Sequence, residues 1–348
     1  MNSPKEKKQD FYMTKALELA KKGFGKTLNN PMVGCVIVFK DQIIGQGYHE
    51  KYGDPHAEPN AVNSVEDKSL ISQSDIYVTL EPCAHHGKTP PCSDLIASYS
   101  PKNLYICNAD PNPLVSGKGI PRIEAKGTKV HWGILEKEGR ALNKRFFTFH
   151  EKKRPYIILK WAETLDGFVA RKNYDSKWIS TTKSRTLVHK WRTEESAIMV
   201  GTNTALYDNP KLNARLFKGK DPVRIVIDKN LTLPNHLNLF DQSIPTICYN
   251  LIKTTSEKNL DYIALDNSAD LLKQLLSHLY DQNIQSVIIE GGSYLLHDVI
   301  KKGLWDEARV FTGNQKFEEG ILAPKVEGHI TSVSKVEDDT LKIITNYP

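Results

Sequence analysis

The residues with the clearest chemical potential are an imidazole, a carboxylate and two thiols, placed as His56-x-Glu58, Pro82-Cys83 and Cys92. One imidazole and two thiolates are ligands that zinc prefers, and a fourth tetrahedral position left open is typical of a catalytic zinc site. In such a site zinc lowers the pKa of bound water from about 15.7 to about 7. Glu58 can then carry a proton between this water and a departing amine. The spacing therefore predicts Zn²⁺ held by His56, Cys83 and Cys92, with Glu58 as the catalytic residue.

The order H-x-E followed by P-C and a second Cys is the pattern of zinc-dependent nucleobase deaminases. In this chain eight residues (AHHGKTPP) separate the two cysteines instead of two, which excludes a structural site of paired Cys-x-x-Cys motifs. An isolated His-x-Glu usually marks an exposed helix start, and an isolated cysteine pair is usually buried and inert. The proline before Cys83 and the strand–turn–helix context favour the metal site. His85 and His86 either contact substrate or only line the loop.

Three predicted elements position these side chains. A strand at Asp75–Leu80 leads into Cys83, and helices over His56–Glu66 and Cys92–Tyr99 begin at His56 and Cys92. Helix starts favour a thiolate and a hydroxide through the helix dipole. Residues two apart point about 200° away from each other in a regular helix, so His56 is expected in the first turn or at the cap.

The remaining pattern of residues 1–150 predicts a layered α/β domain. Cys35, Cys107 and Cys248 lie in apolar strands and are interpreted as core residues. The other predicted elements are a helix at Gln9–Phe24, a hairpin of Val33–Phe39 and Ile43–Tyr48, strands at Leu104–Cys107 and Lys129–Ile134, and a helix from Leu135 to about His150.

The basic stretch Glu151–Pro155 is the predicted boundary, and a second α/β domain is expected over residues 151–348. Gly291-Gly292 follows an apolar strand and allows close approach to a phosphate, but by itself this is a weak signal. The predicted elements are strands at Tyr156–Trp161, Ser196–Val200, Val223–Asp228, Thr246–Tyr249 and Ser286–Glu290, and helices at Thr181–Thr193 and Ala269–Gln282.

The composition is that of an ordinary globular protein: 39% hydrophobic and 25% charged residues, with a net charge of +6. The longest nearly apolar run, Met32–Phe39, is far shorter than the roughly 20 residues that span a bilayer. We therefore expect a cytoplasmic protein without membrane or nucleic-acid partners, and leave a homo-oligomer open. Three alternatives remain: an RNA-editing protein, a scaffold in which zinc is only structural, and a deaminase whose second domain is inactive.

Seven longer stretches of the chain carry a resemblance to a known family: GQGYHEKYGDPHAEPNAV, YVTLEPCAHHGKTPPC, NNPMVGCVIV, DPNPLVSGKG, KWAETLDGFVA, WRTEESAIMVGTNTALYDNPKLNAR and RIVID. Through them the sequence resembles the bifunctional riboflavin-biosynthesis family. The resemblance implies a three-layer α/β/α cytidine-deaminase-like domain over residues 1–150 and a dihydrofolate-reductase-like α/β domain over residues 151–348.

The resemblance also implies the substrates and most of the site residues. The first domain would deaminate 2,5-diamino-6-(5-phosphoribosylamino)pyrimidin-4(3H)-one, and the second would reduce the ribosyl group of the product to ribityl with NADPH. Asn30 and His49 would shape the pyrimidine pocket. The positions implied for NADPH are Ala162, Trp178, Thr204, Asp208, Gly292, Ser293, Tyr294, Leu295, Leu296, His297 and Asp298. Those implied for the substrate of the reductase are Ser176, Arg192, Leu212, Arg215 and Glu290.

Arg192 and Arg215 make physical sense as phosphate ligands, because a guanidinium binds phosphate in a bidentate manner. Lys160 and Glu290, both at strand ends, are interpreted as groups that handle protons in the reductase, although Lys160 is equally suited to a structural ion pair. Two departures from the family pattern are Thr164, where Ser is frequent, and Lys229, to which no role is assigned.

Overall fold

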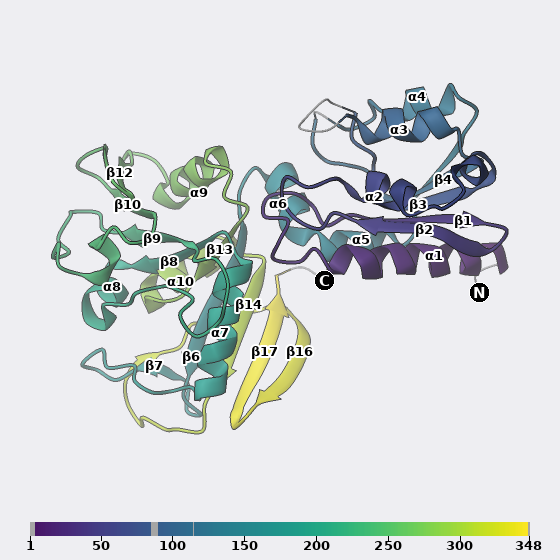
Figure 1. The fold of residues 1–348 in the computed structure, drawn as a ribbon. Helices are drawn as coiled ribbons and strands as arrows, with labels where there is room; N and C mark the ends of the chain where they lie inside the picture. Colours follow the sequence, from purple (N-terminus) through teal and green to yellow (C-terminus); the bar gives the residue numbers. More distant parts are fainter. Residues whose placement is uncertain (1–3, 85–89, 114, 347–348) are drawn as a thin grey trace. The chain divides into compact units, whose positions relative to one another are not determined.

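The computed structural model describes residues 4–84, 90–113 and 115–346. The chain folds into two compact units, Met1–Lys152 and Lys153–Pro348. Each unit contains its own β-sheet with covering helices (Figure 1).

The described residues of the first unit form a five-stranded sheet in the order β2-β1-β3-β4-β5. β1 is antiparallel to β2 and β3, whereas β3, β4 and β5 are parallel. The parallel strands therefore end at one edge of the sheet, where the loops that follow them can form a site. The strands are β1 (Gly34–Phe39), β2 (Gln42–Tyr48), β3 (Asp75–Leu80), β4 (Asn103–Asn108) and β5 (Lys129–Trp132).

Helices cover both faces of this sheet, which makes three layers (Figure 1). Side chains alternate along β1: Cys35 and Ile37 belong to the core with α2 and α3, while Val36 and Val38 pack with α1. This alternation follows from the period of two in a strand. The helices are α1 (Pro4–Lys21), α2 (Ala57–Asn63), the 3-10 helix η1 (Lys68–Gln73), α3 (Cys92–Tyr99), α4 (Ile120–Glu124), α5 (Glu136–Leu142) and α6 (Lys144–Lys152).

Helix α2 lies directly on β2 because Gly47 has no side chain. A Cβ atom at Gly47 would lie 2.4 Å from the backbone nitrogen of Ala61 and 2.6 Å from the carbonyl oxygen of Ala57. The glycine thus sets the height of α2 above the sheet, and with it the height of the residues at the helix start.

The single helix predicted from Leu135 to about His150 is wrong: the structure has two helices, α5 and α6, with a break at Asn143. The Asn143 side chain accepts a hydrogen bond from the Met32 N–H (2.8 Å) and donates one to the Met32 carbonyl (2.9 Å). An Asn side chain tends to form hydrogen bonds with backbone groups, and this disfavours Asn in the middle of a helix. A contact 111 residues away in sequence thereby interrupts the helical pattern.

The second unit contains a ten-stranded sheet, counted over the described residues, in the order β11-β12-β10-β9-β8-β13-β6-β14-β17-β16. The strands from β12 to β14 in this order are parallel, and antiparallel strands extend the sheet on both sides. The strands are β6 (Tyr156–Glu163), β8 (Ala197–Gly201), β9 (Val223–Ile227), β10 (Thr246–Asn250), β11 (Thr255–Glu257), β12 (Leu260–Ala264), β13 (Ser286–Ile289), β14 (Glu307–Thr312), β16 (His329–Val336) and β17 (Asp339–Thr345); β7 (Phe168–Ala170) and β15 (Ile321–Leu322) pair separately.

Both faces of the central part of the larger sheet are buried, whereas the edge strands β11 and β16 are exposed. Val287 and Ile289 of β13 belong to the core that includes α9 and α10, whereas Ile288 points to the opposite core beneath α7. The strands predicted in this unit are confirmed within one or two residues. Seven strands were not predicted: β7, β11, β12, β14, β15, β16 and β17. The helices are α7 (Thr182–Glu194), α8 (Thr202–Asp208), α9 (Leu271–Asp281), α10 (Ser293–Lys301) and the short 3-10 helix η2 (Asn238–Phe240).

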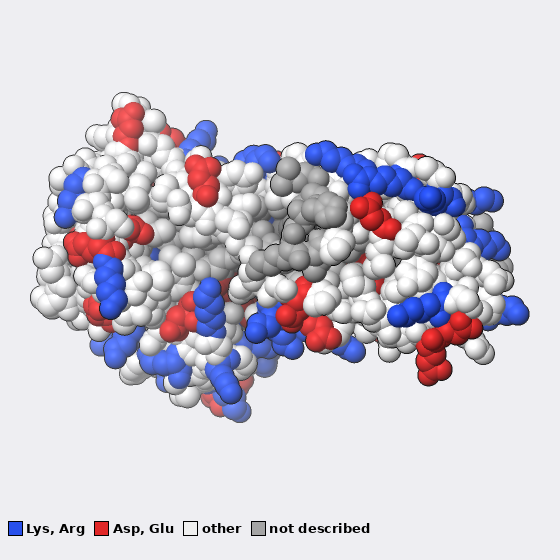
Figure 2. Space-filling view, turned by 45° about the horizontal axis from the view of Figure 1, so that its top comes forward, with Lys and Arg blue, Asp and Glu red and all other residues white. Residues whose placement is uncertain are grey.

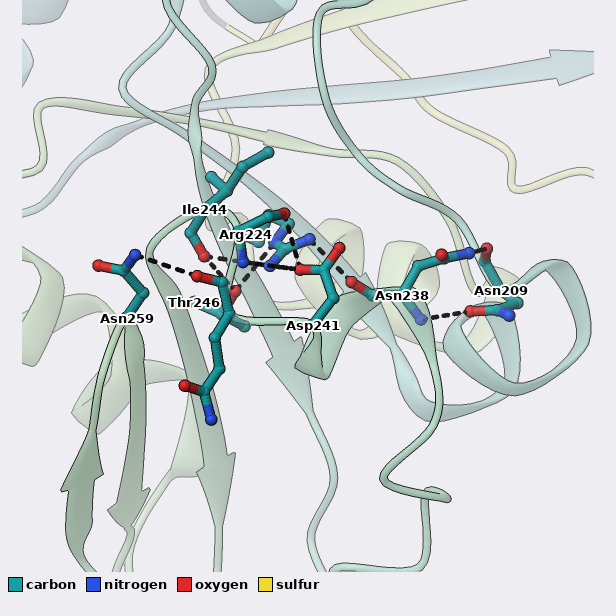
Figure 3. A network of polar contacts seen from close by, with 9 residues as sticks. Asn209, Arg224, Asn238, Asp241, Ile244, Thr246 and Asn259 are labelled. Atoms are coloured by element: carbon teal, nitrogen blue, oxygen red, sulfur yellow. Dashed lines mark hydrogen bonds and ion pairs between the residues drawn. The ribbon is translucent and has the colours of Figure 1, made fainter.

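Arg224 of β9 organises the loop between β9 and β10 (Figure 3). Its side chain is fully buried and donates to the Thr246 hydroxyl, to the Asp241 carboxylate and to two backbone carbonyls. Asn238, one of these carbonyl partners, is hydrogen-bonded to Asn209 at the end of α8. The network therefore ties the end of α8 to the sheet.

Acidic and basic side chains are interspersed over much of the face seen in Figure 2. Among the described helices, none combines the length and the apolar character that crossing a bilayer requires.

Candidate active sites

The three predicted metal ligands come from three different elements of the first unit. His56 is the N-cap residue of α2, with an extended backbone, and its side chain caps no backbone N–H. Cys83 lies in the loop after β3, and Cys92 is the first residue of α3. The predicted position of His56 at the start of its helix is therefore confirmed.

The ligand atoms are close enough to hold one zinc ion. His56 Nδ1 lies 3.6 Å from Cys83 Sγ and 3.4 Å from Cys92 Sγ. All three ligand atoms lie within 4.8 Å of one another. Zinc bonds of about 2.1 Å to nitrogen and 2.3 Å to sulfur in a tetrahedron place N and S about 3.5 Å apart. The donor set and its spacing thus fit zinc with one position left for a further ligand.

The pKa values of the two thiols are shifted in opposite directions. Hydrogen bonds from Cys92 and His56 lower the pKa of the Cys83 thiol to about 4. The same bond to Cys83, together with burial, raises the pKa of Cys92 well above its usual range. The Cys92 backbone N–H also donates to Cys83 Sγ at 3.3 Å. Because both thiolates can form only if a cation compensates them, the site is suited to a divalent metal ion.

Glu58 lies in the first turn of α2 with 4% of its surface exposed. Burial and the nearby Cys83 raise the pKa of its carboxyl group, and its side chain contacts Cys92. A carboxyl group with a raised pKa, beside the metal ligands but in addition to them, is suited to accept and return a proton.

His49 and Asn30 lie beside the metal cluster. The His49 and His56 rings meet edge to face with centroids 5.4 Å apart. His49 Nδ1 lies 3.1 Å from the Pro55 carbonyl and Nε2 lies 3.1 Å from the Asn30 amide nitrogen. Burial lowers the pKa of His49, so the ring is neutral, donates through Nδ1 and accepts from Asn30.

Sequence reasoning missed Glu81, which stands two residues before Cys83. Its buried carboxylate accepts hydrogen bonds from the backbone N–H groups of Gly117 (2.7 Å) and Asp110 (3.2 Å). It therefore joins the loop after β4 to the loop that carries the first cysteine ligand. The only signal in the sequence was an acidic residue directly after an apolar strand.

The three cysteines assigned to the core are buried, as predicted. His85 and His86 lie outside the described residues, so their two alternatives stay open.

The second unit contains a cleft of about 1540 Å³ at the carboxyl ends of the parallel strands. Every residue that the resemblance implied for this unit lines the cleft except His297, which is exposed on α10. His297 Nδ1 instead bonds to the carbonyl of Ser293 at 2.7 Å. Lys160 and Lys229 also line the cleft.

A buried charge cluster forms the floor of this cleft. Arg192 donates from Nε (3.0 Å) and Nη2 (2.7 Å) to the two carboxylate oxygens of Glu290, and Lys160 Nζ lies 3.9 Å from the same carboxylate. Burial alone would raise the pKa of Glu290, but Arg192 and Lys160 outweigh it and lower the pKa to about 2. Burial lowers the pKa of Lys160. The guanidinium group of Arg192 is thus bound to Glu290, and the sequence did not indicate this contact.

Glycines and polar and aromatic side chains also line the cleft. Gly291 and Gly292, with φ of 124° and 76°, lead into α10, and the backbone there is free to approach a phosphate. Ser176 Oγ lies 3.4 Å from the Asp208 carboxylate. Trp178 is 62% exposed, and the Arg185 guanidinium lies 4.4 Å from its ring centroid. These residues can hold a dinucleotide by binding the phosphates and the rings of that ligand.

Comparisons with known proteins agree with this arrangement of two sites. The family model of the cytidine and deoxycytidylate deaminase zinc-binding region matches residues 6–108, and that of the RibD C-terminal domain matches residues 155–314. The riboflavin biosynthesis protein RibD of Actinobacillus pleuropneumoniae is 41% identical over 327 residues, which cover 91% of this chain and 84% of the relative. RibD of Aquifex aeolicus is 40% identical over 329 residues, covering 92% and 88%.

Solved structures agree over almost the whole length. The deaminase/reductase of Thermotoga maritima superimposes with a TM-score of 0.86 at 35% identity, covering 98% of this chain and 99% of that chain. RibD of Acinetobacter baumannii gives a TM-score of 0.87 at 30% identity, with the same coverage. These matches confirm the predicted fold class, a cytidine-deaminase-like unit followed by a dihydrofolate-reductase-like unit.

Proposed function

The chain belongs to the RibD family of riboflavin biosynthesis proteins, and we propose from this membership and from the two sites which residues carry its two reactions. It is a bifunctional enzyme, a zinc-dependent deaminase and an NADPH-dependent reductase. Residues 1–150 would release ammonia from 2,5-diamino-6-(5-phosphoribosylamino)pyrimidin-4(3H)-one. Residues 151–348 would then reduce the ribosyl group of 5-amino-6-(5-phosphoribosylamino)uracil to ribityl. The Thermotoga maritima relative is described as a deaminase and a reductase of these two kinds.

In the deaminase, His56, Cys83 and Cys92 would hold zinc, which when bound supplies Lewis-acid activation of the attacking water. Glu58 would accept the two protons of the attacking water one after the other, and would deliver one to the ring nitrogen and one to the departing amino group, which leaves as ammonia. Asn30 and the neutral His49 border the metal cluster and are assigned to the pyrimidine pocket. The observation that carries this proposal is the convergence of three ligand atoms within 4.8 Å beside a buried carboxyl group.

The test of the deaminase is Glu58→Gln, which preserves the size of the side chain. We expect a stoichiometric zinc content and a fall in ammonia release of about 10²- to 10⁴-fold, the usual contribution of a general acid–base. NADPH oxidation with the uracil substrate serves as the control, because it depends on the other unit. Full ammonia release by the variant would reject Glu58 as the proton carrier.

In the reductase, NADPH supplies the hydride when it is bound, and the protein supplies position and charge. We assign the cofactor to Ala162, Trp178, Thr204, Asp208 and the segment from Gly292 to Asp298. The Gly291-Gly292 turn allows its phosphates to approach the backbone. His297 is the weakest member of this set, because its side chain does not line the cleft.

For the reductase substrate we assign Ser176, Arg192, Leu212, Arg215 and Glu290. Arg215 is assigned as the main ligand of the substrate phosphate, since the guanidinium group of Arg192 is bound to Glu290. Of the two groups suggested for proton transfer, Lys160 is the better donor, because burial lowers its pKa whereas Glu290 stays ionised.

The test is Lys160→Ala, with hydride transfer followed as NADPH oxidation in a single turnover. An unchanged rate would remove Lys160 from the mechanism. Ammonia release measured on the same preparation is the control for the first unit.

We propose in addition that the enzyme acts in the cytoplasm on small phosphoribosyl pyrimidines and needs neither nucleic acid nor membrane. The near balance of acidic and basic residues, with a net charge of +6 in 348 residues, supports this. Salt-dependent retention of tRNA would contradict it.

A further inference from the structure

Two exposed tyrosines of the second unit stack on each other in the reductase cleft, and neither has an assigned role. The rings of Tyr174 and Tyr207 are nearly parallel, with an angle of 3° between their planes and 4.3 Å between their centroids. Both residues line the cleft, and 38% of Tyr174 and 52% of Tyr207 is exposed. The hydrophobic cores of this unit, taken over the described residues, do not include either tyrosine. The stack is therefore a contact at the surface of the cleft.

The stack connects two elements from different parts of the chain. Tyr174 lies in the loop that runs from β7 to α7, and Tyr207 lies in the last turn of α8. Beside the stack, Ser176 Oγ of the same loop lies 3.4 Å from the carboxylate of Asp208, which also belongs to α8. Two neighbouring contacts thus join the loop to the end of α8.

The end of α8 is the fixed side of this connection. Asn209, the C-cap residue of α8, accepts hydrogen bonds from the backbone N–H and from the side-chain amide of Asn238, both at 2.7 Å. The Asn238 carbonyl in turn accepts a hydrogen bond from the buried Arg224 (Figure 3). Tyr207 therefore projects from a helix end that is tied to the sheet.

The loop is held by other contacts near its two ends. The guanidinium group of Arg171 lies 3.9 Å from the ring centroid of Phe317, and the Gln315 side chain donates to the Trp178 carbonyl at 2.7 Å. Between these ends, Tyr174 has a left-handed backbone with φ of 68°, which bulky residues rarely adopt because it is sterically unfavourable. Stacking on α8 offsets this cost, since an aromatic pair is stabilising beyond the area that it buries.

We propose that Tyr174 and Tyr207 are positioning residues of the reductase, whose stack holds the loop against α8 and thereby keeps Ser176 and Trp178 in place for the substrate and for NADPH. Ser176 and Trp178 follow Tyr174 closely in the same loop and line the same cleft. Without the stack, binding would have to order this loop, and the ordering would reduce the affinity for both ligands. The inference rests on the proposed reductase function, to which it adds two residues that act through their neighbours.

The first experiment removes one ring at a time, in Tyr174→Ala and in Tyr207→Ala. NADPH oxidation with the uracil substrate gives KM and kcat, and fluorescence titration gives the Kd for NADPH. We expect each variant to raise KM and Kd about two- to tenfold, which corresponds to the strength of one aromatic pair. The kcat should change by less than about twofold, because bound ligands at saturation order the loop again.

Conservative and neighbouring variants separate positioning from a general loss of stability. Tyr174→Phe and Tyr207→Phe keep the rings, so both should retain the KM and Kd of the wild type. The matched control is Leu206→Ala, since Leu206 is next to Tyr207 on α8 and 42% exposed but does not line the cleft. This control should also resemble the wild type.

A double variant tests whether the two rings act as a pair. Tyr174→Ala combined with Tyr207→Ala should raise KM and Kd no further than the larger single effect, because each ring acts through the other. If Tyr207→Ala disturbs the folding of α8, Tyr174→Ala and Tyr174→Phe give the same comparison from the loop side.

Unchanged KM and Kd in the alanine variants, equal losses in the phenylalanine variants, or effects that multiply in the double variant would each overturn the inference. If the wild-type enzyme does not oxidise NADPH with this substrate, the proposed function fails instead, so the two failures are distinguishable.

Discussion

The buried carboxylate of Glu290 allows a quantitative prediction about the second unit. Only 7% of its side chain is exposed, and it binds Arg192 through both oxygens. Its pKa is lowered from 4.5 to about 2 by Arg192 and Lys160, against the opposing effect of burial. One pKa unit corresponds to about 1.4 kcal/mol, so the ionised carboxylate contributes about 3 kcal/mol to the free energy of unfolding.

The sign of the pH dependence follows from the direction of this change. A carboxyl group whose pKa is lower in the folded state stabilises the fold above its unfolded pKa of 4.5, and this contribution is lost as pH falls toward 2. We therefore expect Glu290→Gln to lower the free energy of unfolding by about 3 kcal/mol at about pH 7. At about pH 3.5 the difference from wild type should shrink by about 1 kcal/mol.

Urea unfolding followed by tryptophan fluorescence measures both values. The matched control is Glu319→Gln, since Glu319 also forms an ion pair, with Lys172, but both side chains are about 70% exposed. An exposed pair contributes little, so this control should resemble wild type. Equal losses in the two variants, or a Glu290→Gln effect that does not change with pH, would refute the reasoning.

Three further predictions concern the supports of the two sites. Gly47→Ala places a Cβ atom 2.4 Å from the Ala61 backbone nitrogen, so α2 must move; we expect zinc below stoichiometry by elemental analysis and slower ammonia release, with NADPH oxidation unchanged. Arg224→Met removes the network of Figure 3 and should lower the free energy of unfolding by about 3–5 kcal/mol in urea, whereas a mild effect would show that the loop is held otherwise. Asp306→Asn breaks the buried pair with Arg154 and should lower the free energy of unfolding in urea by about 3 kcal/mol; a value equal to that of the wild type would contradict this.

The sequence could predict the metal centre because the residue types of the ligands and their spacing along the chain are enough to indicate zinc chemistry. Histidine, glutamate and cysteine in this order have few alternative uses, and the apolar pattern placed them after a strand end and at two helix starts. The same apolar pattern located the central strands of both sheets. The α/β class followed from these patterns, whereas the family and the two fold types came from the resemblance of longer stretches, and the comparisons confirm them.

Other features depended on partners that are far away in the sequence. Asn143 breaks a helix because it binds Met32, and Glu81 braces a loop through backbone groups that no periodicity reveals. Strand β17 (Asp339–Thr345) pairs with β14 (Glu307–Thr312), about thirty residues earlier, and it was missed because its residues do not form one long apolar run.

The residue types of this chain, read in order, determine which chemistry it can perform, because ligand preference and hydride or proton transfer are properties of the groups themselves. The tertiary structure decides how each group is used. Arg192 binds Glu290 rather than standing free for phosphate, and His189 is neutral because it is buried beside cations. Burial and the choice of partner arise only when distant segments pack, and they set the charge state on which each role depends.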